Sequence, residues 1–207
     1  MDRRLFLASA AASFAAASLT GAITLPAYAA LSADDAKKFI DGLSDQAIGT
    51  LTGTSITQAD RETRFRNLLE AHFDMPGISK FVLGRYWKAA TPPQQADFQK
   101  LFETLLVQSY AKTFAQYGAD KFQVTRSTAD SDGSVIVNSH VDRPNGDTIK
   151  LDWRVAGDGA DMRIIDLIIE GVSLRTTHRS DFASAIQSNG GTVDALLTLL
   201  RQKTGQA

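Results

Sequence analysis

The stretch MRIIDLIIEGVSLRTTHRSDF, residues 162–182, contains the sharpest change of pattern in the chain. We interpret Met162 to Leu174 as a β-strand with apolar side chains at Ile164, Ile165, Leu167, Ile168 and Ile169. Because neighbouring side chains of a strand point to opposite faces, this pattern puts apolar groups on both faces. We therefore expect a strand that is more deeply enclosed than the others in its sheet, followed by a helix at about residues 180–188.

The same stretch contains Ser173, His178 and Asp181, the residue types of a hydrolytic triad. If the extended chain continues to His178, the odd separation points Ser173 and His178 to opposite faces, roughly 16 Å apart. A sharp turn at Thr176 or Thr177 would be needed to bring them together. Asp181 falls in the first turn of the next helix, where the helix dipole stabilises a carboxylate. The G-x-S-x-G pattern is also absent around Ser173. We predict no catalytic residues.

Upstream of this strand, apolar residues recur with the period of two that is typical of half-buried strands. The alternating positions are Phe122 and Val124, then Val135, Val137 and Val141, then Ile149, Leu151, Trp153 and Val155. The sequence Pro-Asn-Gly-Asp at residues 144–147 joins two of these runs as a hairpin turn. Each run is apolar on one face only, so we predict an antiparallel sheet of about four strands with one covered face.

Before these strands, apolar residues recur at three- and four-residue steps, which indicates helices. We expect helices at about residues 32–51 and 58–72, and a short helix from Ile78 that ends near Trp87. Thr91-Pro92-Pro93-Gln94 has the residue types of a capped helix start, and the long helix it begins continues past Phe114 towards Gly118. A helix at about residues 193–203 ends the chain. The predicted class is α+β, with the N-terminal helices packed on one face of the sheet.

Residues 1–29 read as a secretory signal peptide, with two arginines, a weakly hydrophobic Ala/Ser segment and a cleavage site that ends at Ala29. The start, Arg3-Arg4-Leu5-Phe6-Leu7, also fits the twin-arginine export pattern, although an ordinary Sec signal has a basic start as well. The remaining chain has a net charge near −2 and no cysteine. We therefore expect one domain, residues 30–207, in the bacterial periplasm, stabilised by its core rather than by disulfides, with no nucleic-acid partner.

Histidines are the remaining candidates for metal or acid–base chemistry. His72, His140 and His178 are the only three, and no two of them have the spacing of metal ligands. Asp166 with Arg163 or His140 is the nominal dyad that an enzyme would use. We expect no metal and no cofactor.

The predicted helices carry many large apolar side chains, more than a single sheet face would be expected to cover. An ordinary packed core is the favoured explanation from the residues alone, because no sequence pattern separates a filled core from one with an empty centre. The residues alone therefore predict an exported α+β domain without catalytic machinery.

Several short motifs occur in a characteristic order: Phe73-Asp74-Met75, Val82-Leu83-Gly84-Arg85-Tyr86-Trp87, Thr91-Pro92, Ser109-Tyr110-Ala111, and Asp166 with Glu170-Gly171-Val172-Ser173-Leu174. In these motifs the chain resembles the MlaC-like family of periplasmic lipid-binding proteins, also called toluene-tolerance proteins. The resemblance covers about residues 35–203. Family members often have Trp and a second aromatic before the aspartate of the fourth strand, where Met162 and Ile165 stand here. Residues 179–191 look closest to the branch associated with hopanoid biosynthesis.

The resemblance implies a soluble carrier that moves lipid between an outer-membrane lipoprotein complex and an inner-membrane ABC transporter with its MCE-domain ring. It also implies a curved sheet with helices that enclose an apolar cavity, akin to the NTF2-like cone. Glu170-Gly171 would then break the fourth strand where it leaves the cavity. The cargo that the resemblance implies is a phospholipid or a hopanoid-type lipid.

On this basis we expect the lipid tails to contact a set of apolar residues from the helices and the sheet. The set is Phe81, Val82, Tyr86, Trp87, Phe98, Leu101, Phe102, Leu105, Tyr110, Val137, Leu151, Trp153, Leu167 and Ile169. Arg85, Arg175 and Arg179 are candidates for contact with a headgroup or a protein partner, with plain solvation as the alternative. Two other functions stay open, a periplasmic protein-interaction module and a small NTF2-like enzyme.

Overall fold

The computed structural model describes residues 31–53, 55–116 and 121–206, so the predicted signal peptide lies outside the described residues. The helices before the sheet are α1 (Ala33–Leu51), α2 (Gln58–His72), α3 (Met75–Leu83), α4 (Arg85–Ala89), α5 (Pro92–Tyr110) and the 3-10 helix η1 (Ala111–Gln116). The strands are β1 (Lys121–Ala129), β2 (Val135–Asp142), β3 (Thr148–Ala156), β4 (Arg163–Ile169) and β5 (Val172–Ser173), with η2 (Gly159–Asp161) before β4. Helices α6 (Leu174–Ser188) and α7 (Val193–Thr204) follow. None of the described helices has the length and hydropathy needed to cross a membrane.

The strands form one antiparallel sheet in the order β1-β2-β3-β4-β5. This confirms the α+β class and the antiparallel sheet, and it adds a two-residue fifth strand to the four expected. The single strand predicted from Met162 to Leu174 is wrong in its second half, because the chain reverses at Glu170 and Gly171. The break that the family resemblance implied at these two residues is confirmed. These two residues have positive φ angles of 49° and 81°. The Glu170 side chain accepts a hydrogen bond from the backbone N–H of Lys150, which fixes the turn against β3.

Helix α6 begins six residues earlier than the pattern at Ser180 predicts. Ser173 is its N-cap, and the Ser173 hydroxyl accepts a hydrogen bond of 3.2 Å from the backbone N–H of Thr176. The extended conformation expected between Ser173 and His178 is therefore wrong, and Asp181 lies well past the first turn of the helix. The apolar residues in this part of α6 are too sparse for periodicity to mark its start.

The helix expected from Ile78 to Trp87 is instead two helices, α3 and α4, which meet at Gly84. Gly84 has a φ of 58°, and a Cβ atom there would lie 3.2 Å from the Arg179 guanidinium. A residue with a side chain would be strained in this conformation and would also crowd Arg179. The long helix is also shorter than expected, because α5 ends at Tyr110 and continues as η1.

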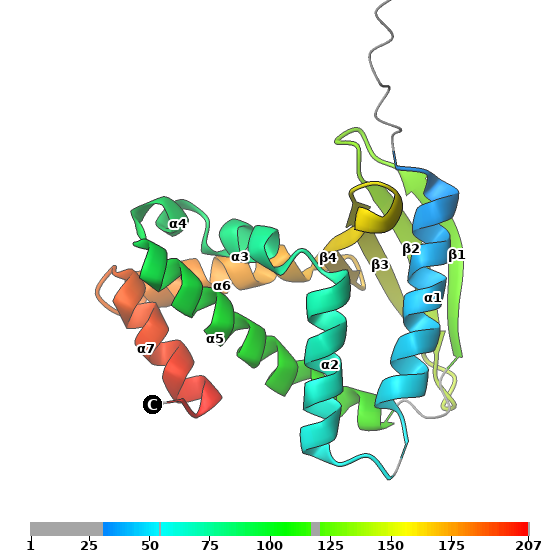
Figure 1. Cartoon of the computed structure of the whole chain (residues 1–207), viewed down its shortest axis with the longest axis horizontal. Helices are drawn as coiled ribbons and strands as arrows, with labels where there is room; N and C mark the ends of the chain where they lie inside the picture. The colour runs from blue at the N-terminus through cyan, green and yellow to red at the C-terminus, as the bar shows by residue number, and fades with distance from the viewer. Residues whose placement is uncertain (1–30, 54, 117–120, 207) are drawn as a thin grey trace, which may run out of the picture.

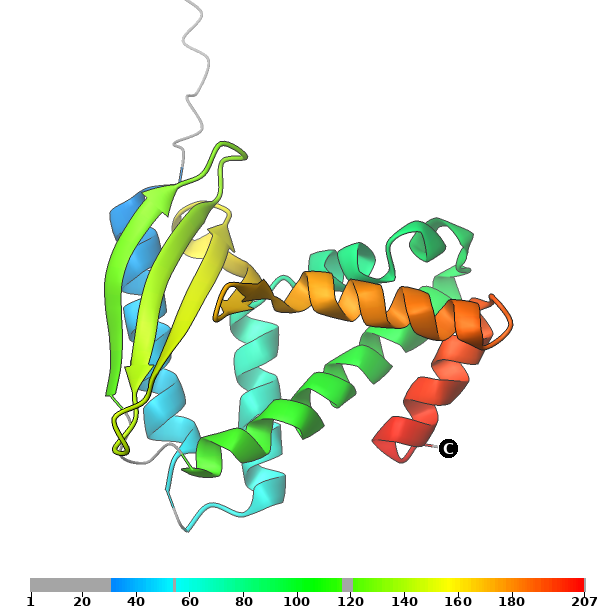
Figure 2. The same ribbon diagram turned by 180° about the vertical axis from the view of Figure 1, so that it is seen from behind.

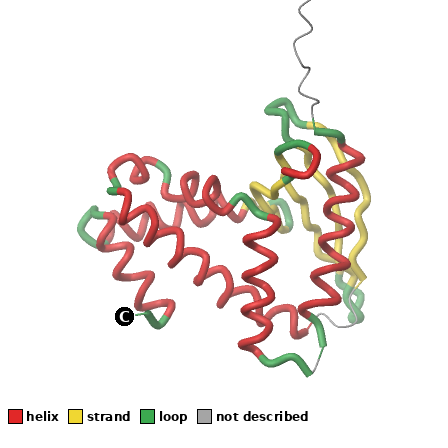
Figure 3. The backbone as a smooth tube through the Cα atoms, in the orientation of Figure 1, coloured by secondary structure: helices red, strands yellow, loops and turns green. Residues whose placement is uncertain are grey.

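Helix α1 packs along one face of the curved sheet, and α3 to α7 gather beside the sheet (Figures 1 and 2). Figure 3 shows the same division, with the strands on one side of the molecule and most helices on the other. The side chains form two main cores accordingly. The sheet cluster joins α1 to the sheet through Ala36, Ile40, Leu43, Val135, Val137, Val155 and Ile164. The helical cluster joins α3, α5, α6 and α7 through Val82, Phe98, Leu101, Phe102, Phe182, Ile186 and Leu196.

Candidate functional site

A cavity of about 330 Å³ lies between the sheet, the C-terminal half of α1, α2 and the C-terminal half of α5. This volume falls within the range of about 300 to 1,000 Å³ that is typical of small-molecule sites. The cavity borders both the sheet cluster and the helical cluster. It therefore occupies the space where the two cores do not meet.

The sheet wall of the cavity consists of side chains that the strand register places in neighbouring rows. Phe122, Val141 and Ile149 are paired across β1, β2 and β3. Leu151 pairs with Ile169, and Trp153 with Leu167, across β3 and β4. All seven line the cavity. The next row, Val135, Val155 and Ile164, is fully buried in the sheet cluster. The cavity thus covers the end of the sheet face that the sheet cluster leaves open.

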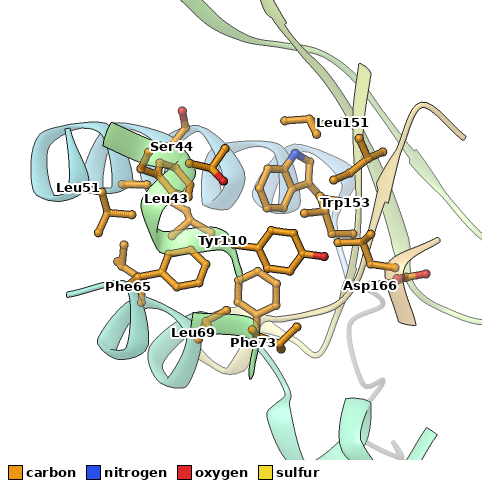
Figure 4. Close-up of a pocket in the computed structure, with 18 of the residues that line it drawn as sticks. Leu43, Ser44, Leu51, Phe65, Leu69, Phe73, Tyr110, Leu151, Trp153 and Asp166 are labelled. Carbon is orange, nitrogen blue, oxygen red and sulfur yellow. The ribbon is translucent and has the colours of Figure 1, made fainter. Parts of the chain in front are cut away.

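The opposite wall is built from helices and is rich in aromatic rings. Phe65 and Leu69 of α2, Phe73 and Tyr110 converge with Trp153 in the close-up view (Figure 4). Leu43 and Leu51 of α1 close a further side of the cavity (Figure 4). Many of these side chains are only half-buried, so the cavity presents apolar surface to whatever fills it. Exposed apolar surface on this scale is a feature of binding sites.

The polar atoms at the sheet wall have partners within the protein. The Trp153 indole N–H donates a hydrogen bond of 2.9 Å to the Ser139 hydroxyl, which in turn donates one of 2.8 Å to the Leu151 carbonyl. The Trp153 N–H and the Ser139 hydroxyl therefore both have hydrogen-bond partners within the sheet. Tyr110 projects its ring into the cavity, and burial raises the pKa of its hydroxyl.

A buried polar cluster forms one edge of the cavity where β4 meets α6. Asp166 is 5% exposed, and its carboxylate accepts hydrogen bonds from the Ser173 hydroxyl at 2.6 Å and from the Arg175 backbone N–H at 3.2 Å. The Arg175 Nε lies 3.3 Å from the same carboxylate. These contacts hold the start of α6 against β4 and give each carboxylate oxygen of Asp166 a hydrogen-bond donor.

The structure does not assemble the dyad that an enzyme would need. Arg163 donates a hydrogen bond to the Met162 carbonyl, and His140 pairs with Asp142 at 3.4 Å. Among the described residues, neither side chain forms a hydrogen bond or an ion pair with Asp166. Within the same described ranges, no group of three or more His, Asp or Glu residues is arranged to hold a metal ion.

His178 lines the cavity but has no catalytic partner. Its ring lies 5.3 Å from the ring of Phe102 and 5.8 Å from that of Phe182, and its Nε2 is buried without a hydrogen bond to any described residue. Desolvation lowers the His178 pKa, and the charge of Asp181 opposes this effect. Among the described residues, no hydrogen bond joins His178 to Ser173. The Ser173 hydroxyl instead donates to Asp166.

The structure brings together six of the fourteen residues that the sequence suggested for tail contact. The six lining residues are Phe102, Tyr110, Leu151, Trp153, Leu167 and Ile169. The other eight are absent from the lining: Phe81, Val82, Tyr86, Trp87, Phe98, Leu101 and Leu105 pack in or against the helical cluster, and Val137 is in the sheet cluster. The physical reason is that apolar periodicity identifies the buried face of a helix and not what that face packs against.

The three arginines singled out for headgroup or partner contact lie in different surroundings. Arg175 lines the cavity, and its guanidinium lies 4.4 Å from the centre of the Phe81 ring. Arg179 lies 5.0 Å from the same ring and donates to the Phe81 carbonyl. Arg85 donates to the Tyr86 hydroxyl and does not line the cavity.

Sequence reasoning missed much of the lining. The missed residues from α1 and α2 include Leu43, Ala47, Ile48, Leu51, Phe65, Leu68 and Leu69, and those from the strands include Phe122, Val141 and Ile149. One usable signal was the strand alternation, which puts Phe122, Val141 and Ile149 on the same face as Trp153. The lining residue Ile48 is 40% exposed, so the cavity reaches solvent beside the last turn of α1.

Comparison with known proteins agrees with this architecture. The curated toluene tolerance protein ttg2D of Pseudomonas putida is 25% identical over 160 residues, which cover 75% of this chain and 74% of that protein. A solved phospholipid-binding protein from Ralstonia solanacearum, determined in complex with a phospholipid, has a TM-score of 0.72 and 26% identity to this chain. That comparison covers 83% of this chain and 97% of the other.

The family described as MlaC protein matches residues 41–202. These residues include α2 to α6, most of α7, all five strands and the whole cavity lining. The chain therefore belongs to the MlaC family.

Proposed function

We propose that this protein is a periplasmic lipid carrier, which holds the acyl chains of a phospholipid or the hydrocarbon of a hopanoid-type lipid in its cavity. The open apolar cavity between the two clusters carries this proposal. The bound phospholipid named for the Ralstonia solanacearum protein supports it. The signal-peptide pattern of residues 1–29 supports export to the periplasm.

A carrier is needed because lipid tails do not stay free in water. At about 0.8 kcal/mol per buried methylene, two acyl chains with some thirty carbons cost on the order of 20 kcal/mol to expose. We propose that the protein collects its cargo at one membrane complex and delivers it to another, an outer-membrane lipoprotein complex and an inner-membrane ABC transporter with an MCE-domain ring. The cavity supplies no direction, which must come from these partners.

We propose contact with the tails for the six predicted residues that line the cavity, together with the aromatic wall of Phe65 and Phe73. Arg175 is the arginine best positioned to meet a headgroup, because it lines the cavity while 23% of its side chain stays exposed. A guanidinium in such a position can bind a phosphate through charge-assisted hydrogen bonds. The protein carries its lipid unchanged, since Asp166 is committed to Ser173 and Arg175.

The direct test is to purify the protein from its native periplasm, extract the bound lipid and identify it by mass spectrometry. We expect a stoichiometric lipid of one class, which remains chemically unchanged on incubation. A lipid-free protein would contradict the carrier proposal and favour a protein-interaction module. Recovery of a cleaved or modified lipid would favour an enzyme.

A variant that fills the cavity provides a sharper test. Ala47 of α1 lines the cavity, so Ala47→Trp places an indole in the space of the tails. We expect retained lipid to fall by about tenfold or more, equivalent to about 1.4 kcal/mol of lost binding free energy. The matched control is Ala59→Trp, at an exposed position of α2 outside the lining, which should keep its lipid. Equal lipid content in the two variants would place the lipid elsewhere.

A further inference from the structure

We infer that the Tyr110 hydroxyl donates a hydrogen bond to an ester carbonyl of the bound lipid, so that this residue favours ester-linked lipids over those without the carbonyl. This inference rests on the proposed lipid carriage and adds a specificity-determining residue to it. It concerns one polar atom in a predominantly apolar lining. The argument starts from where that atom lies and what surrounds it.

Tyr110 is the last residue of α5, at the point where the chain tightens into η1. Its ring lies between Phe73 and Trp153 and crosses the cavity rather than lying along a wall (Figure 4). The hydroxyl points towards the side of the cavity where Trp153 and Asp166 lie (Figure 4). The polar tip of the side chain therefore sits where a tail would otherwise meet only carbon.

No described residue accepts a hydrogen bond from this hydroxyl. The polar groups on that side of the cavity already have partners, since Trp153 donates to Ser139 and Asp166 accepts from Ser173 and Arg175. A lipid that fills the cavity removes this hydroxyl from water, and a hydroxyl without a partner in apolar surroundings is unfavourable, so a cargo with an acceptor at this point binds better than one without. A tyrosine hydroxyl carries its proton at neutral pH, and burial raises the Tyr110 pKa further, so Tyr110 is available as a donor.

The ester carbonyls of a glycerolipid supply such an acceptor at the top of each tail. The same direction leads towards Asp166, which pairs with Arg175, the arginine proposed for the headgroup. In a glycerophospholipid the ester carbonyls and the phosphate are separated by only a few bonds. A single glycerophospholipid thus carries an acceptor for Tyr110 and a phosphate for Arg175, whereas the fused hydrocarbon rings of a hopanoid offer no acceptor along their length.

The test compares two phosphatidylcholines with the same headgroup and sixteen-carbon chains, one joined through esters and the other through ethers, which lack the carbonyl oxygen. Both compete with a fluorescent phospholipid for the purified protein after its bound lipid has been removed. We expect the wild-type protein to prefer the diester lipid by about five- to tenfold, the factor for one hydrogen bond between neutral groups. Tyr110→Phe keeps the ring and should bind the two lipids equally.

The matched control is Tyr86→Phe, which removes a hydroxyl that bonds Arg85 outside the cavity lining and should keep the diester preference. A thermal melt checks that Tyr110→Phe is folded, and we expect no loss of stability because the hydroxyl has no hydrogen-bond partner among the described residues. Equal wild-type affinity for the two lipids, or a preference that survives in Tyr110→Phe, overturns the inference and leaves the carrier proposal intact. Failure of the wild type to bind either lipid overturns both.

Discussion

His178 has a different role in the structure from the one that its position in the sequence suggests. Next to Ser173 and Asp181 in the chain it suggests a triad, whereas in space its ring contacts Phe102 and Phe182. Desolvation by these surroundings disfavours the imidazolium form and lowers the pKa of His178 below its ordinary value of 6.5. Its helix places it at the cavity, where a neutral ring is compatible with a lipid tail.

The lowered pKa predicts a pH dependence of stability. As the pH falls below 6.5, His178 gains a proton more readily in the unfolded chain than in the folded protein. The stabilising contribution of neutral His178 to the free energy of unfolding is therefore complete above pH 6.5 and is lost as the pH falls below this value. We expect His178→Phe to flatten the fall in urea-measured stability between about pH 7 and pH 5.

Some slope should remain in that variant, because burial and the charge of Arg163 also lower the pKa of His72. A variant with the same slope as the wild type would show that His178 is not the titrating group.

At the scale of elements, α5 connects the helical cluster to the cavity. It has 19 residues, which at about 1.5 Å per residue gives a length of about 29 Å. Phe98 and Leu101 near its start are buried in the helical cluster, and Leu106 and Tyr110 near its end line the cavity. Its start was predicted at Thr91 from residue types alone, and the structure confirms a complete capping box there. Local caps of this kind are predictable because donor, acceptor and helix lie within four residues.

We expect Thr91→Ala to lower the free energy of unfolding by about 1 kcal/mol, because the Thr91 hydroxyl accepts a hydrogen bond from the Gln94 backbone. Thr91→Ser keeps this acceptor and serves as the control. Lipid content should be unchanged in both, since Thr91 is at the opposite end of α5 from Tyr110. Urea denaturation measures the stability, and equal losses in the two variants would show that the cap hydrogen bond is not responsible.

The start of α6 was not predictable in the same way. Ser173 is a good N-cap, but its chain neighbours also fit a continued strand. The turn before it places Glu170, which is not a glycine, at a positive φ angle, and local sequence does not predict this. The choice depends on Asp166, seven residues away in sequence, which receives the Ser173 hydroxyl and the Arg175 backbone N–H. A contact between β4 and α6 decides where the helix begins.

At the scale of the whole molecule, the two cores leave between them a cavity that no single element contains. Its lining comes from α1, α2, α3, α5, α6 and four strands. An unfilled apolar cavity lacks dispersion contacts on one side, so a hydrocarbon that fills it stabilises the folded state. Lipid binding and the stability of the folded protein are therefore linked.

This link predicts that lipid removal lowers stability by mass action. A lipid present at about one hundred times its Kd should raise the free energy of unfolding by about 2.7 kcal/mol. Chemical denaturation of the delipidated and reloaded protein measures the difference. Ala47→Trp should show a smaller gain on lipid addition, and Ala59→Trp should match the wild type. A wild-type protein with the same stability in both forms would contradict binding in the cavity.

The sequence by itself determined the α+β class, the capping box at Thr91, the face that β1 to β3 bury and the absence of metal-ligand spacing, because these depend on patterns within a few residues. Only the tertiary structure decided that Tyr110, Trp153 and Phe102 face a cavity while Phe98 and Val137 are packed away. Apolar side chains that meet each other and those that face a cavity are chemically alike. The difference is the distance between two walls, which is set by how the helical cluster and the sheet cluster pack around it.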